Sequence, residues 1–358
     1  MLKPLIKSTL KAACVAAAPL CSKKSTMDEQ TARSVLEAAS ARPGGTALRK
    51  NTILPPTCDL QIIIPAYNVE DYLAECMDSV LSQQTKYDFR VVLVDDGSTD
   101  ATPAIADRYA DDPRVRVIHQ ENRGFSGARN VALEEIFGRY LMFVDSDDLL
   151  FPGAIEALLS AAYEQGCDVA EGGAYYLTGN EQTVMYRYEA AGTADPFSFH
   201  GQPWAKVYKA EIFENLQFPE GFWYEDSILA FLVWPGIKSA FRVPEMAYIH
   251  RRNPKGITAA SRGRPKAVDT CWITEQLMEE RAALGLPVDG AYFTQLLDQI
   301  RLNHYRIKAL PEEIQEAAFV LSCCLLKAQF PSFPKETTLT KALKTKDFGA
   351  FRMCCKFY

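Results

Sequence analysis

Hydrophobic and polar residues are grouped in blocks between residues 60 and 164. Four short apolar runs occur there, and each precedes an amphipathic stretch in which apolar residues recur with helical spacing. Continuous apolar runs are typical of strands buried on both faces, and the strand-helix order favours an α/β fold with a mainly parallel sheet flanked by helices. The predicted strand and helix pairs are 62–64 with 69–84, 91–94 with 101–110, 115–118 with 127–137, and 140–144 with 153–164.

Polar residues follow each of these four predicted strands, at 65–68, 95–98, 119–123 and 145–148. Each loop by itself is ordinary turn chemistry, because Asp, Gly, Ser and Asn favour turns and helix caps. In an open parallel sheet, however, the loops after the strands meet at the carboxyl edge, where ligands bind. Their shared position predicts a binding site at that edge.

The rest of the chain predicts two further regions. Residues 1–57 contain the turn-forming segments Pro43-Gly44-Gly45 and Pro55-Pro56 near their end. Such segments are typical of an N-terminal extension or linker. Residues 58–262 then form the α/β domain. Helical spacing returns near residue 265, so residues 263–358 are predicted to form a helical C-terminal region, with helices at 275–283, 293–307 and 312–327.

The two ends of the chain are basic and leave alternatives open. Lys3, Lys7 and Lys11 precede a small-residue apolar run at 12–21, which resembles a weak signal peptide, but the short run and Pro19 favour a flexible or amphipathic leader. The C-terminal tail is either a surface that docks on an anionic membrane or, more commonly for such tails, a solvated helix end. Its basic residues are Lys335, Lys341, Lys344, Lys346, Arg352 and Lys356.

Charge and cysteine usage narrow the class of protein. The chain has 39 basic and 45 acidic residues, so its net charge of -6 gives no general attraction to nucleic acid. Its ten cysteines are scattered without metal-binding spacing, and we expect reduced thiols in a cytoplasmic protein. The four histidines share no zinc-enzyme pattern, and no apolar run approaches the roughly 18 residues of a membrane span. A metal site in this chain should therefore be made of oxygen ligands.

Asp145 and Asp147 are two residues apart at the end of an apolar strand, so their carboxylates are predicted to point to the same side. Two carboxylates on one side suit Mg2+ or Mn2+, which prefers oxygen ligands and keeps positions for water and phosphate. Alternatively, Asp147 or Asp148 caps the helix that begins near residue 152. Three neighbouring carboxylates repel one another unless a cation neutralises them, and this favours the metal.

The loops after the second and third strands offer further polar groups. Asp95 and Asp96 precede a tight turn at Gly97, where a carboxylate can accept a hydrogen bond from a uracil N–H or a ribose hydroxyl, or can simply stabilise the turn. Arg129 lies in the glycine-containing segment 122–130 at a predicted helix start, and such positions attract phosphate. A structural ion pair between Arg129 and Asp95 or Asp96 is the equal alternative.

Glu225 and Asp226 begin an apolar run that is predicted to be helical as far as Trp234. A carboxylate at a helix start commonly caps the helix. Beside the aromatic residues Trp223 and Tyr224, it can also act as a general base that deprotonates an incoming hydroxyl. Position alone favours the cap.

Seven segments, taken in order, closely resemble the family 2 glycosyltransferases with the GT-A fold, particularly the branch that builds bacterial surface polysaccharides. The match runs from about Asp59 to Ser261 and does not include the N-terminal extension or the C-terminal helices. The resemblance implies a Rossmann-like, mainly parallel sheet flanked by helices. The segments are IIIPAYNVEDYL, VVLVDDGSTDAT, NRGFSGARNVAL, YLMFVDSDDLL, PWAKVYKAEIF, YEDSILAF and HRRNPKGIT.

The resemblance also implies roles for individual residues. Asp145 and Asp147 fall on the family's DxD motif, which holds Mn2+ or Mg2+ on the diphosphate, and Asp226, next to Glu225, falls on the carboxylate used as base. His250 is a candidate third metal ligand, where relatives often carry Tyr or Arg. The donor-binding residues implied by the same motifs are Pro65, Tyr67, Glu70 and Asp96 near the uracil and ribose, Arg129 close by, Asp145 at the diphosphate, Trp204 and Lys206 at the acceptor and donor side, and Arg252 in the basic segment near the diphosphate.

The reaction implied by this resemblance is an inverting transfer in a single displacement. A sugar moves from a UDP-sugar to a hydroxyl of a glycan or lipid-linked glycan acceptor, and Asp226 removes the proton of that hydroxyl. We expect a cytoplasmic protein with no nucleic-acid partner, and peripheral contact with the inner face of the membrane through a terminal segment is the alternative.

Two other functions are weighed against this one. A sugar nucleotidyltransferase has a similar sheet and an acidic metal site, but it needs a loop rich in glycine and lysine after the first strand, where this chain has Pro65-Ala66-Tyr67-Asn68. A non-catalytic domain that only binds a nucleotide-sugar or a glycan has no need of Asp145, Asp147 and Asp226 together.

Overall fold

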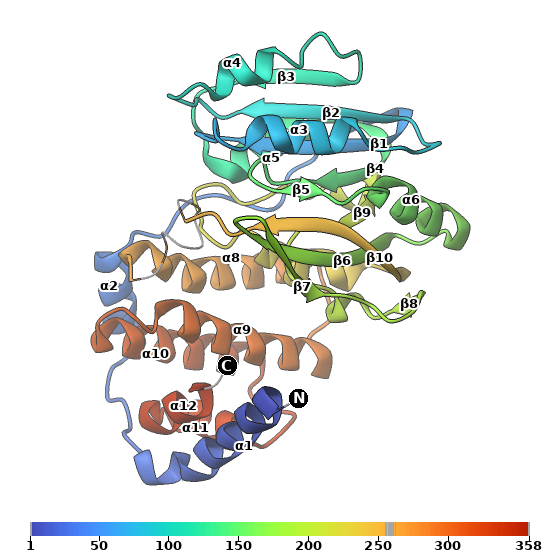
Figure 1. The fold of residues 1–358 in the computed structure, drawn as a ribbon. Helices are drawn as coiled ribbons and strands as arrows, with labels where there is room; N and C mark the ends of the chain where they lie inside the picture. Colours follow the sequence, from blue (N-terminus) through green and yellow to red (C-terminus); the bar gives the residue numbers. More distant parts are fainter. Residues whose placement is uncertain (1, 255, 257–260, 262, 357–358) are drawn as a thin grey trace. The chain divides into compact units, whose positions relative to one another are not determined.

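The computed structural model describes residues 2–254, 256, 261 and 263–356 and divides the chain into two compact units (Figure 1). The α/β unit comprises residues 44–221 and 225–256, and the helical unit comprises the described parts of residues 1–43, 222–224 and 257–358. The predicted N-terminal extension 1–57 is therefore divided between the two units. The predicted boundary at residue 262 and part of the last matched segment, at Lys255 and residues 257–258, lie outside the described residues.

One sheet forms the centre of the α/β unit, and the four strands predicted from the apolar runs are parallel to one another as expected. β9 enters antiparallel between β4 and β6, and β10 pairs with β6 in parallel. The order is β3-β2-β1-β4-β9-β6-β10-β5, with β7 paired to β6 and β8 paired to β10. The strands are β1 (Thr52–Ala66), β2 (Phe89–Asp95), β3 (Val115–His119), β4 (Glu135–Phe143), β5 (Leu149–Leu150), β6 (Val169–Thr178), β7 (Glu181–Tyr186), β8 (Gly192–Ala194), β9 (Lys206–Lys209) and β10 (Ala240–Arg251).

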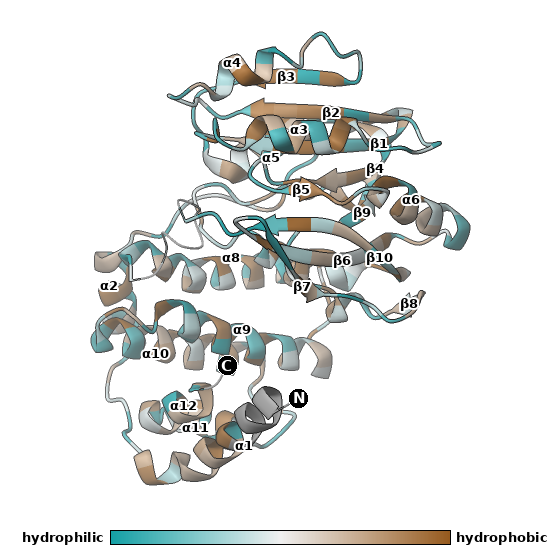
Figure 2. Cartoon of the chain, viewed as in Figure 1, coloured by the Kyte–Doolittle hydropathy of each residue, from teal (hydrophilic) through white to brown (hydrophobic). Residues whose placement is uncertain are grey.

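Burial on both faces of the central strands explains their continuous apolar sequence. Ile62, Ile63 and Ile64 in β1 and Met142 and Phe143 in β4 are all 0% exposed. Figure 2 shows hydrophobic colouring along β2, which is mostly buried, and hydrophilic colouring along β7, which is largely exposed. The predicted helices of this unit are present as α3 (Leu73–Leu81), α4 (Thr102–Asp107), α5 (Gly124–Leu133) and α6 (Ala154–Gln165).

The helix predicted at 127–137 ends four residues early, because the chain there passes directly into β4 at Glu135. The side chain of Gln61 in β1 explains the change. Its Nε2 donates to the carbonyl of Ala132 at 2.9 Å, and its Oε1 accepts from the N–H of Phe137 at 2.9 Å. A Cβ on Gly138 would lie 2.5 Å from the backbone nitrogen of Gln61, so β4 approaches β1 closely only because residue 138 is glycine.

β1 also begins earlier than the apolar run predicts, at Thr52. The prolines that suggested a linker lie inside this strand, at a shift in the pairing of β1 with β4 between Ile53 and Cys58. Proline cannot donate to a strand ladder, and strands accommodate it at such irregularities. Pro55 and Pro56 therefore mark a bulge rather than the end of an extension.

The helical unit combines both ends of the chain. The N-terminal segment predicted as an extension forms α1 (Leu2–Ala17) and α2 (Glu29–Ala39), and these lie with the C-terminal helices (Figure 1). The helices predicted at 275–283 and 293–307 are present and begin earlier than predicted. The helix predicted at 312–327 is present and ends later. The C-terminal helices are α8 (Asp269–Ala283), α9 (Gly290–Ile307), α10 (Glu312–Gln329), α11 (Thr338–Lys344) and α12 (Phe348–Cys355).

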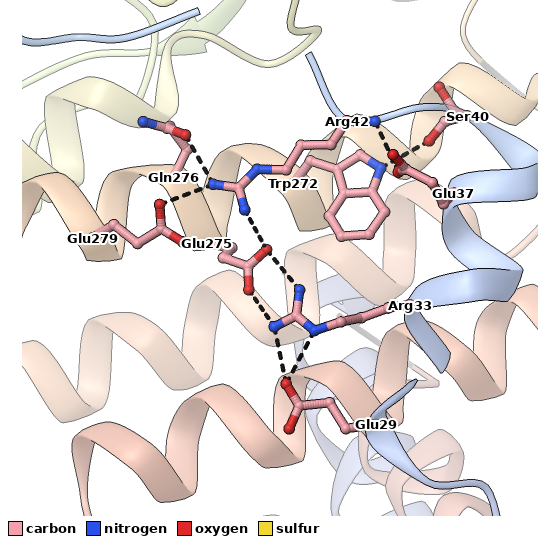
Figure 3. A network of polar contacts seen from close by, with 9 residues as sticks. All are labelled: Glu29, Arg33, Glu37, Ser40, Arg42, Trp272, Glu275, Gln276 and Glu279. Atoms are coloured by element: carbon pink, nitrogen blue, oxygen red, sulfur yellow. Dashed lines mark hydrogen bonds and ion pairs between the residues drawn. The ribbon is translucent and has the colours of Figure 1, made fainter. Parts of the chain in front are cut away.

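A network of charged side chains joins α2 and the residues after it to α8 (Figure 3). Glu275 of α8 is 4% exposed at its side chain, and it accepts from Arg33 at 2.6 Å and from Arg42 at 3.0 Å. The indole of Trp272 donates to the carbonyl of Ser40 at 2.9 Å. Two arginines compensate one buried carboxylate here, which explains why the N-terminal segment packs on the C-terminal helices instead of acting as a linker.

All ten cysteines are free thiols, in agreement with the expected reduced state. Across the residues that the structure describes, no helix combines the length and the apolar character that a bilayer crossing requires.

Candidate active site

The strand order places the candidate site at the carboxyl ends of β1 and β4. From β1 the chain continues to β2 and β3 on one side, whereas β4 pairs with the other side of β1. This reversal of direction opens a crevice at the strand ends in α/β sheets, and ligands bind there. Pro65 and Tyr67 lie at the end of β1, and Asp145 follows β4.

The loop after β1 is bonded to the loop after β2. Asn68 has a left-handed backbone with φ of 51°, and its side chain accepts from the N–H of Thr99 at 2.8 Å. Glu70 accepts from the N–H of Ala101 at 2.8 Å, so this predicted donor contact also holds the two loops together. Tyr67, by contrast, is 49% exposed, and its ring is available to a ligand.

Asp96 is buried in the loop after β2, and its two carboxylate oxygens differ in their contacts. Its Oδ1 accepts from Gln120 at 2.6 Å and from the N–H of Arg123 at 2.8 Å. Its Oδ2 is buried and has no hydrogen-bond partner among the described residues. Burial raises the pKa of Asp96 above its ordinary value, against the hydrogen bonds that it accepts.

His119 was not singled out by the sequence, yet it holds the neighbouring strand ends. Its Nδ1 lies 2.9 Å from Asp95 Oδ2, and its Nε2 lies 3.1 Å from Asp107 Oδ1. The hydrogen bond to Asp95, with help from Asp107, raises the pKa of His119. Position 119 at the end of β3 was the available signal, because Asp95 ends the adjacent β2.

Arg129 links two of the predicted site segments. Its Nη2 donates to Asp145 Oδ1 at 2.7 Å and its Nη1 donates to Glu225 Oε1 at 2.6 Å. The predicted ion pair with Asp95 or Asp96 is wrong, because the side chain, 5% exposed, is already committed to these two other carboxylates. Burial alone would lower the pKa of Arg129, but Asp145 and Glu225 outweigh it and raise that pKa further.

The side chain of Glu225 therefore forms an ion pair with Arg129 and does not cap a helix. The run that follows forms a π-helical turn at Leu229–Val233, and no side chain caps it. Burial raises the pKa of Glu225, while Arg129 opposes that rise. Asp226, the predicted base, is the next residue and is partly exposed. The bridge through Arg129 therefore connects the loop of Asp145 to the segment that carries Asp226.

The three residues before Glu225 belong to the helical unit. The N–H of Trp223 donates to Asp269 Oδ2 at 2.8 Å, and Asp269 at the start of α8 is 0% exposed. The guanidinium of Arg306 in α9 lies 3.9 Å from the ring centre of Tyr224. Trp223 and Tyr224 are thus held within the helical unit by α8 and α9.

Neither Asp147 nor Asp148 caps α6, because the N-cap position is Gly153 with φ of 82° and no side-chain cap is present. Asp147 Oδ2 accepts from Asn253 at 2.9 Å, and burial, followed by the charge of Asp145, raises the pKa of Asp147. Asp148 is fully buried and supports the loop from inside. The cap alternative is therefore wrong, and the contact of Asn253 with Asp147 was not predicted.

His250 contacts Asp148 rather than the predicted metal pair. Its Nδ1 lies 3.0 Å from Asp148 Oδ2, and its ring stacks on Trp204 at 5.5 Å between centres. Burial opposes protonation of His250, but its hydrogen bond to Asp148 and the nearby aspartate charges together raise its pKa. Within the described part of the chain, no group of three or more His, Cys, Asp or Glu side chains is arranged to hold a metal, so Asp145, Asp147 and His250 do not form a ready three-ligand set.

Lys206 is placed where it cannot reach a donor. It is 0% exposed, its Nζ pairs with Glu171 at 2.6 Å, and it donates to the carbonyls of Gln202 and Trp204. Burial lowers the pKa of Lys206 despite that pair. The assignment of Lys206 to donor binding is corrected to a structural ion pair inside the sheet, and Trp204, 2% exposed, is likewise a core residue stacked on Tyr248.

Lys206→Met is expected to lower the free energy of unfolding by about 3–5 kcal/mol, because it leaves Glu171 buried without its cation. Denaturant unfolding measures the change. Lys209→Met is the matched control, since Lys209 pairs with Asp168 at a side chain that is 34% exposed. The control should lose no more than about 1 kcal/mol. Equal losses in the two variants would contradict the buried role of Lys206.

Arg252 is the exposed cation of this region. Its guanidinium lies 4.6 Å from the ring centre of Tyr176, and no carboxylate pairs with it among the described residues. Arg251 beside it is occupied, since it bonds Glu75 at 2.6 Å and the carbonyl of Asp147 at 2.9 Å. Of the two arginines, Arg252 is thus the one whose charge is available to an anionic ligand.

Comparison with known proteins identifies the domain. Residues 61–224 match glycosyl transferase family 2. The chain is 36% identical over 191 residues to the glycosyltransferase GlyA of Streptococcus pneumoniae, a match that covers 48% of this chain and 27% of GlyA. It is 33% identical over 216 residues to the uncharacterized glycosyltransferase EpsJ of Bacillus subtilis, covering 56% of this chain and 62% of EpsJ. The matches thus span less than two thirds of either relative.

Solved structures share the fold. The structure of residues 1–349 of S. aureus TarS in complex with UDP-GlcNAc superposes with a TM-score of 0.55, at 21% identity, over 83% of this chain and 90% of that one. The GT-A architecture expected from the sequence is therefore confirmed. The family match thus identifies residues 61–224 as a glycosyl transferase family 2 domain.

Proposed function

We propose that this protein transfers a sugar from a UDP-sugar to a hydroxyl of a glycan or lipid-linked glycan, with inversion at the anomeric carbon. The observation that carries the proposal is the bridge by which Arg129 joins Asp145 to Glu225. The bridge connects the loop at the sheet crevice with the segment of Asp226. A site for the leaving diphosphate and a base for the acceptor are then parts of one bonded assembly.

The nucleotide end of the donor is assigned to the loops after β1 and β2. The buried Oδ2 of Asp96, which has no hydrogen-bond partner in the described part of the chain, can accept from a uracil N–H or a ribose hydroxyl. The exposed ring of Tyr67, beside Pro65, offers a surface on which a base can stack. Arg252 supplies an available positive charge for the diphosphate.

Asp226 is the proposed base because its neighbour is already in use. Glu225 accepts from Arg129 at 2.6 Å, and proton abstraction by Glu225 would break that pair. Asp226 takes the proton from the acceptor hydroxyl as its oxygen attacks the anomeric carbon, and the bond to UDP breaks in the same step. Arg129 holds Asp145 and the base segment in fixed positions, which preserves the alignment that an in-line displacement requires.

The residues present fit a divalent cation in an open site. Asp145 and Asp147 both follow β4, and burial and then the charge of Asp145 raise the pKa of Asp147, as expected for neighbouring carboxylates that repel one another. Asp145 and Asp147 would hold Mn2+ or Mg2+ with two hard oxygen donors, and phosphate and water oxygens would complete the set. When bound, such a cation supplies neutralisation of the charge on the departing diphosphate. His250 is not needed for this set.

Asp147→Asn is expected to raise the Mn2+ concentration needed for half-maximal transfer by at least about 10-fold, because one of two carboxylate ligands is lost. The measurement is UDP release against Mn2+ concentration. Asp111→Asn, at an exposed position in the loop before β3, is the control and should leave the curve unchanged. Activity in excess chelator at the full rate would contradict the proposed cation site.

The class of reaction is tested by UDP release from a panel of UDP-sugars, with and without glycan acceptors. The complex of TarS with UDP-GlcNAc supports UDP-GlcNAc as the first donor to examine. Transfer or slow hydrolysis of at least one donor is expected. Binding of UDP-sugars without any turnover would instead favour the non-catalytic alternative.

A further inference from the structure

Within the helical unit, the two ends of the described chain are bonded side by side. The N–H of Ser25 donates to the carbonyl of Lys346 at 2.8 Å, and the N–H of Gly349 donates to the carbonyl of Lys23 at 3.2 Å. Asp347 accepts from the N–H of Lys23 at 3.0 Å. Figure 1 shows α1, α11 and α12 grouped at the same end of this unit.

This grouping depends on a close backbone approach at α12. A Cβ on residue 349 would lie 1.9 Å from the carbonyl oxygen of Cys21, a distance that no side chain tolerates. Only glycine lets α12 pack against residues 21–23 in this way. Residues 2–24 and 335–356 thus form one continuous region, which we call the terminal basic surface.

The charge of the terminal basic surface is opposite to that of the rest of the protein. It contains eleven Lys and Arg and only two Asp and Glu, whereas the remainder of the chain has 28 basic and 43 acidic residues. A net charge of +9 in under fifty residues therefore sits in a protein whose total is -6. Such segregation is typical of a surface that binds an extended anion.

Several of these cations are exposed and have no ion-pair partner among the described residues. Lys335, Lys341 and Lys344 are exposed and form no ion pair with any described residue. Lys23 and Arg352 do have a partner, but both share the single carboxylate of Glu312, at 2.7 and 3.1 Å. The surface consequently keeps a strong positive potential.

The same surface also exposes large apolar side chains. Leu20 is 89% exposed and Leu10 is 46% exposed, two of the nine large apolar side chains that are exposed in the described part of the chain. In the sequence, Lys3, Lys7 and Lys11 recur every four residues among apolar residues. This pattern is typical of amphipathic segments that lie in a membrane interface.

We infer that the terminal basic surface docks this protein on an anionic phospholipid membrane. Lysines close to such a surface each contribute electrostatic attraction, and Leu10 and Leu20 add apolar contact that a soluble polyanion would not use. The apolar contact is the reason for choosing a lipid surface over nucleic acid or an anionic glycan. A lipid-linked acceptor would then be met at the same surface, although the inference does not depend on the transfer reaction.

The test is co-sedimentation of the full chain with phospholipid vesicles. The protein should bind vesicles containing about one third phosphatidylglycerol in phosphatidylcholine, and should bind far less to pure phosphatidylcholine. Binding should weaken as salt rises from about 0.1 to 0.5 M, because the Debye length shortens. Binding that is equal on the two vesicle types, or absent from both, would overturn the inference.

Two variants separate the charge from the apolar contact. The triple variant Lys335→Gln, Lys341→Gln and Lys344→Gln is expected to weaken binding to the anionic vesicles about five-fold per lysine, on the order of 100-fold in all. Leu20→Asp is expected to weaken it about tenfold.

The matched control replaces three exposed cations of the α/β unit, Lys50→Gln, Arg187→Gln and Lys238→Gln, and should bind as the parent does. Thermal unfolding checks that every variant is folded. Equal losses in the control and the test triple, or tighter binding to duplex DNA than to the anionic vesicles, would overturn the inference. UDP release in solution should be the same for the parent and the test triple, so a failure of the proposed transfer activity would be seen separately.

Discussion

Asp226→Asn is expected to lower kcat for sugar transfer by about 10²–10⁴-fold while leaving the affinity for the UDP-sugar nearly unchanged. The asparagine amide has nearly the shape of the carboxylate but cannot take a proton, and the nucleotide contacts proposed for Asp96 and Tyr67 are on other loops. Transfer is followed by UDP release with acceptor present, and donor affinity by calorimetric titration. Asp111→Asn, exposed and outside the site, is the control and should match the parent in both measurements.

The neighbouring carboxylate distinguishes the two candidate bases. Glu225→Gln removes the charge that Arg129 compensates, so its main effect should be on stability, with Asp226 still able to take the proton. If Asp226→Asn kept the parent kcat while Glu225→Gln abolished transfer without unfolding, the roles of the two residues would be exchanged. Loss of donor affinity in Asp226→Asn would instead assign Asp226 to donor binding.

Arg129→Met is expected to lower the free energy of unfolding by about 3–5 kcal/mol at neutral pH, because it leaves the buried Glu225 without its cation. Arg114→Met is the matched control, since Arg114 pairs with Asp112 where the side chains are 35% and 25% exposed. That control should lose no more than about 1 kcal/mol. Urea unfolding of the two variants and the parent gives the comparison.

The loss in the free energy of unfolding of Arg129→Met should be larger at high pH than at low pH. Burial already raises the pKa of Glu225 in the folded parent, and removal of Arg129, which opposes that rise, should raise it further. A carboxyl group whose pKa is higher in the folded state destabilises the fold above that pKa, and the penalty disappears as the pH falls below it and the folded state gains the proton. The gap between variant and parent should therefore be largest above pH 7 and shrink toward about pH 5.

The double variant Arg129→Met with Glu225→Gln provides the independent check. It removes the charge that the single variant leaves uncompensated, so it should recover part of the lost stability and most of the pH dependence. If the single variant were as stable as the parent at every pH, the bridge would carry no stabilisation and the argument that it aligns the site would fail.

Local sequence patterns determined the first half of the sheet and much of the site. The apolar runs that became β1 to β4 are buried on both faces, and no long-range information is needed to recognise them. Because each run was followed by a polar loop, the positions of Asp96 and Asp145 at strand ends followed directly from the same pattern. The metal role of Asp147 was predicted from its spacing with Asp145, and the role of Asp226 as base came with the family motifs; both stay predictions.

Contacts between distant residues decided what the patterns left open or predicted wrongly. Lys206 is 35 residues from Glu171 in sequence, and only the antiparallel insertion of β9 beside β6 buries the two together. Arg129 and Glu225 are 96 residues apart, so nothing local indicated which carboxylates the arginine would choose. Arg33 reaches Glu275 across 242 residues, which turned a supposed extension into part of the helical unit.

The physical reason is the range of the interactions involved. Helix and strand periodicity is set by neighbours within a few residues, and the sequence by itself therefore determined the elements and the strand ends where a ligand can bind. The partner of a buried charge is set by the surrounding fold. Because an unpaired buried charge is very costly, the charge pairs with the opposite charge that the topology brings close to it. The tertiary structure alone thus decided that Lys206 is internal, that Arg129 joins Asp145 to Glu225, and that the two basic ends of the chain form one surface.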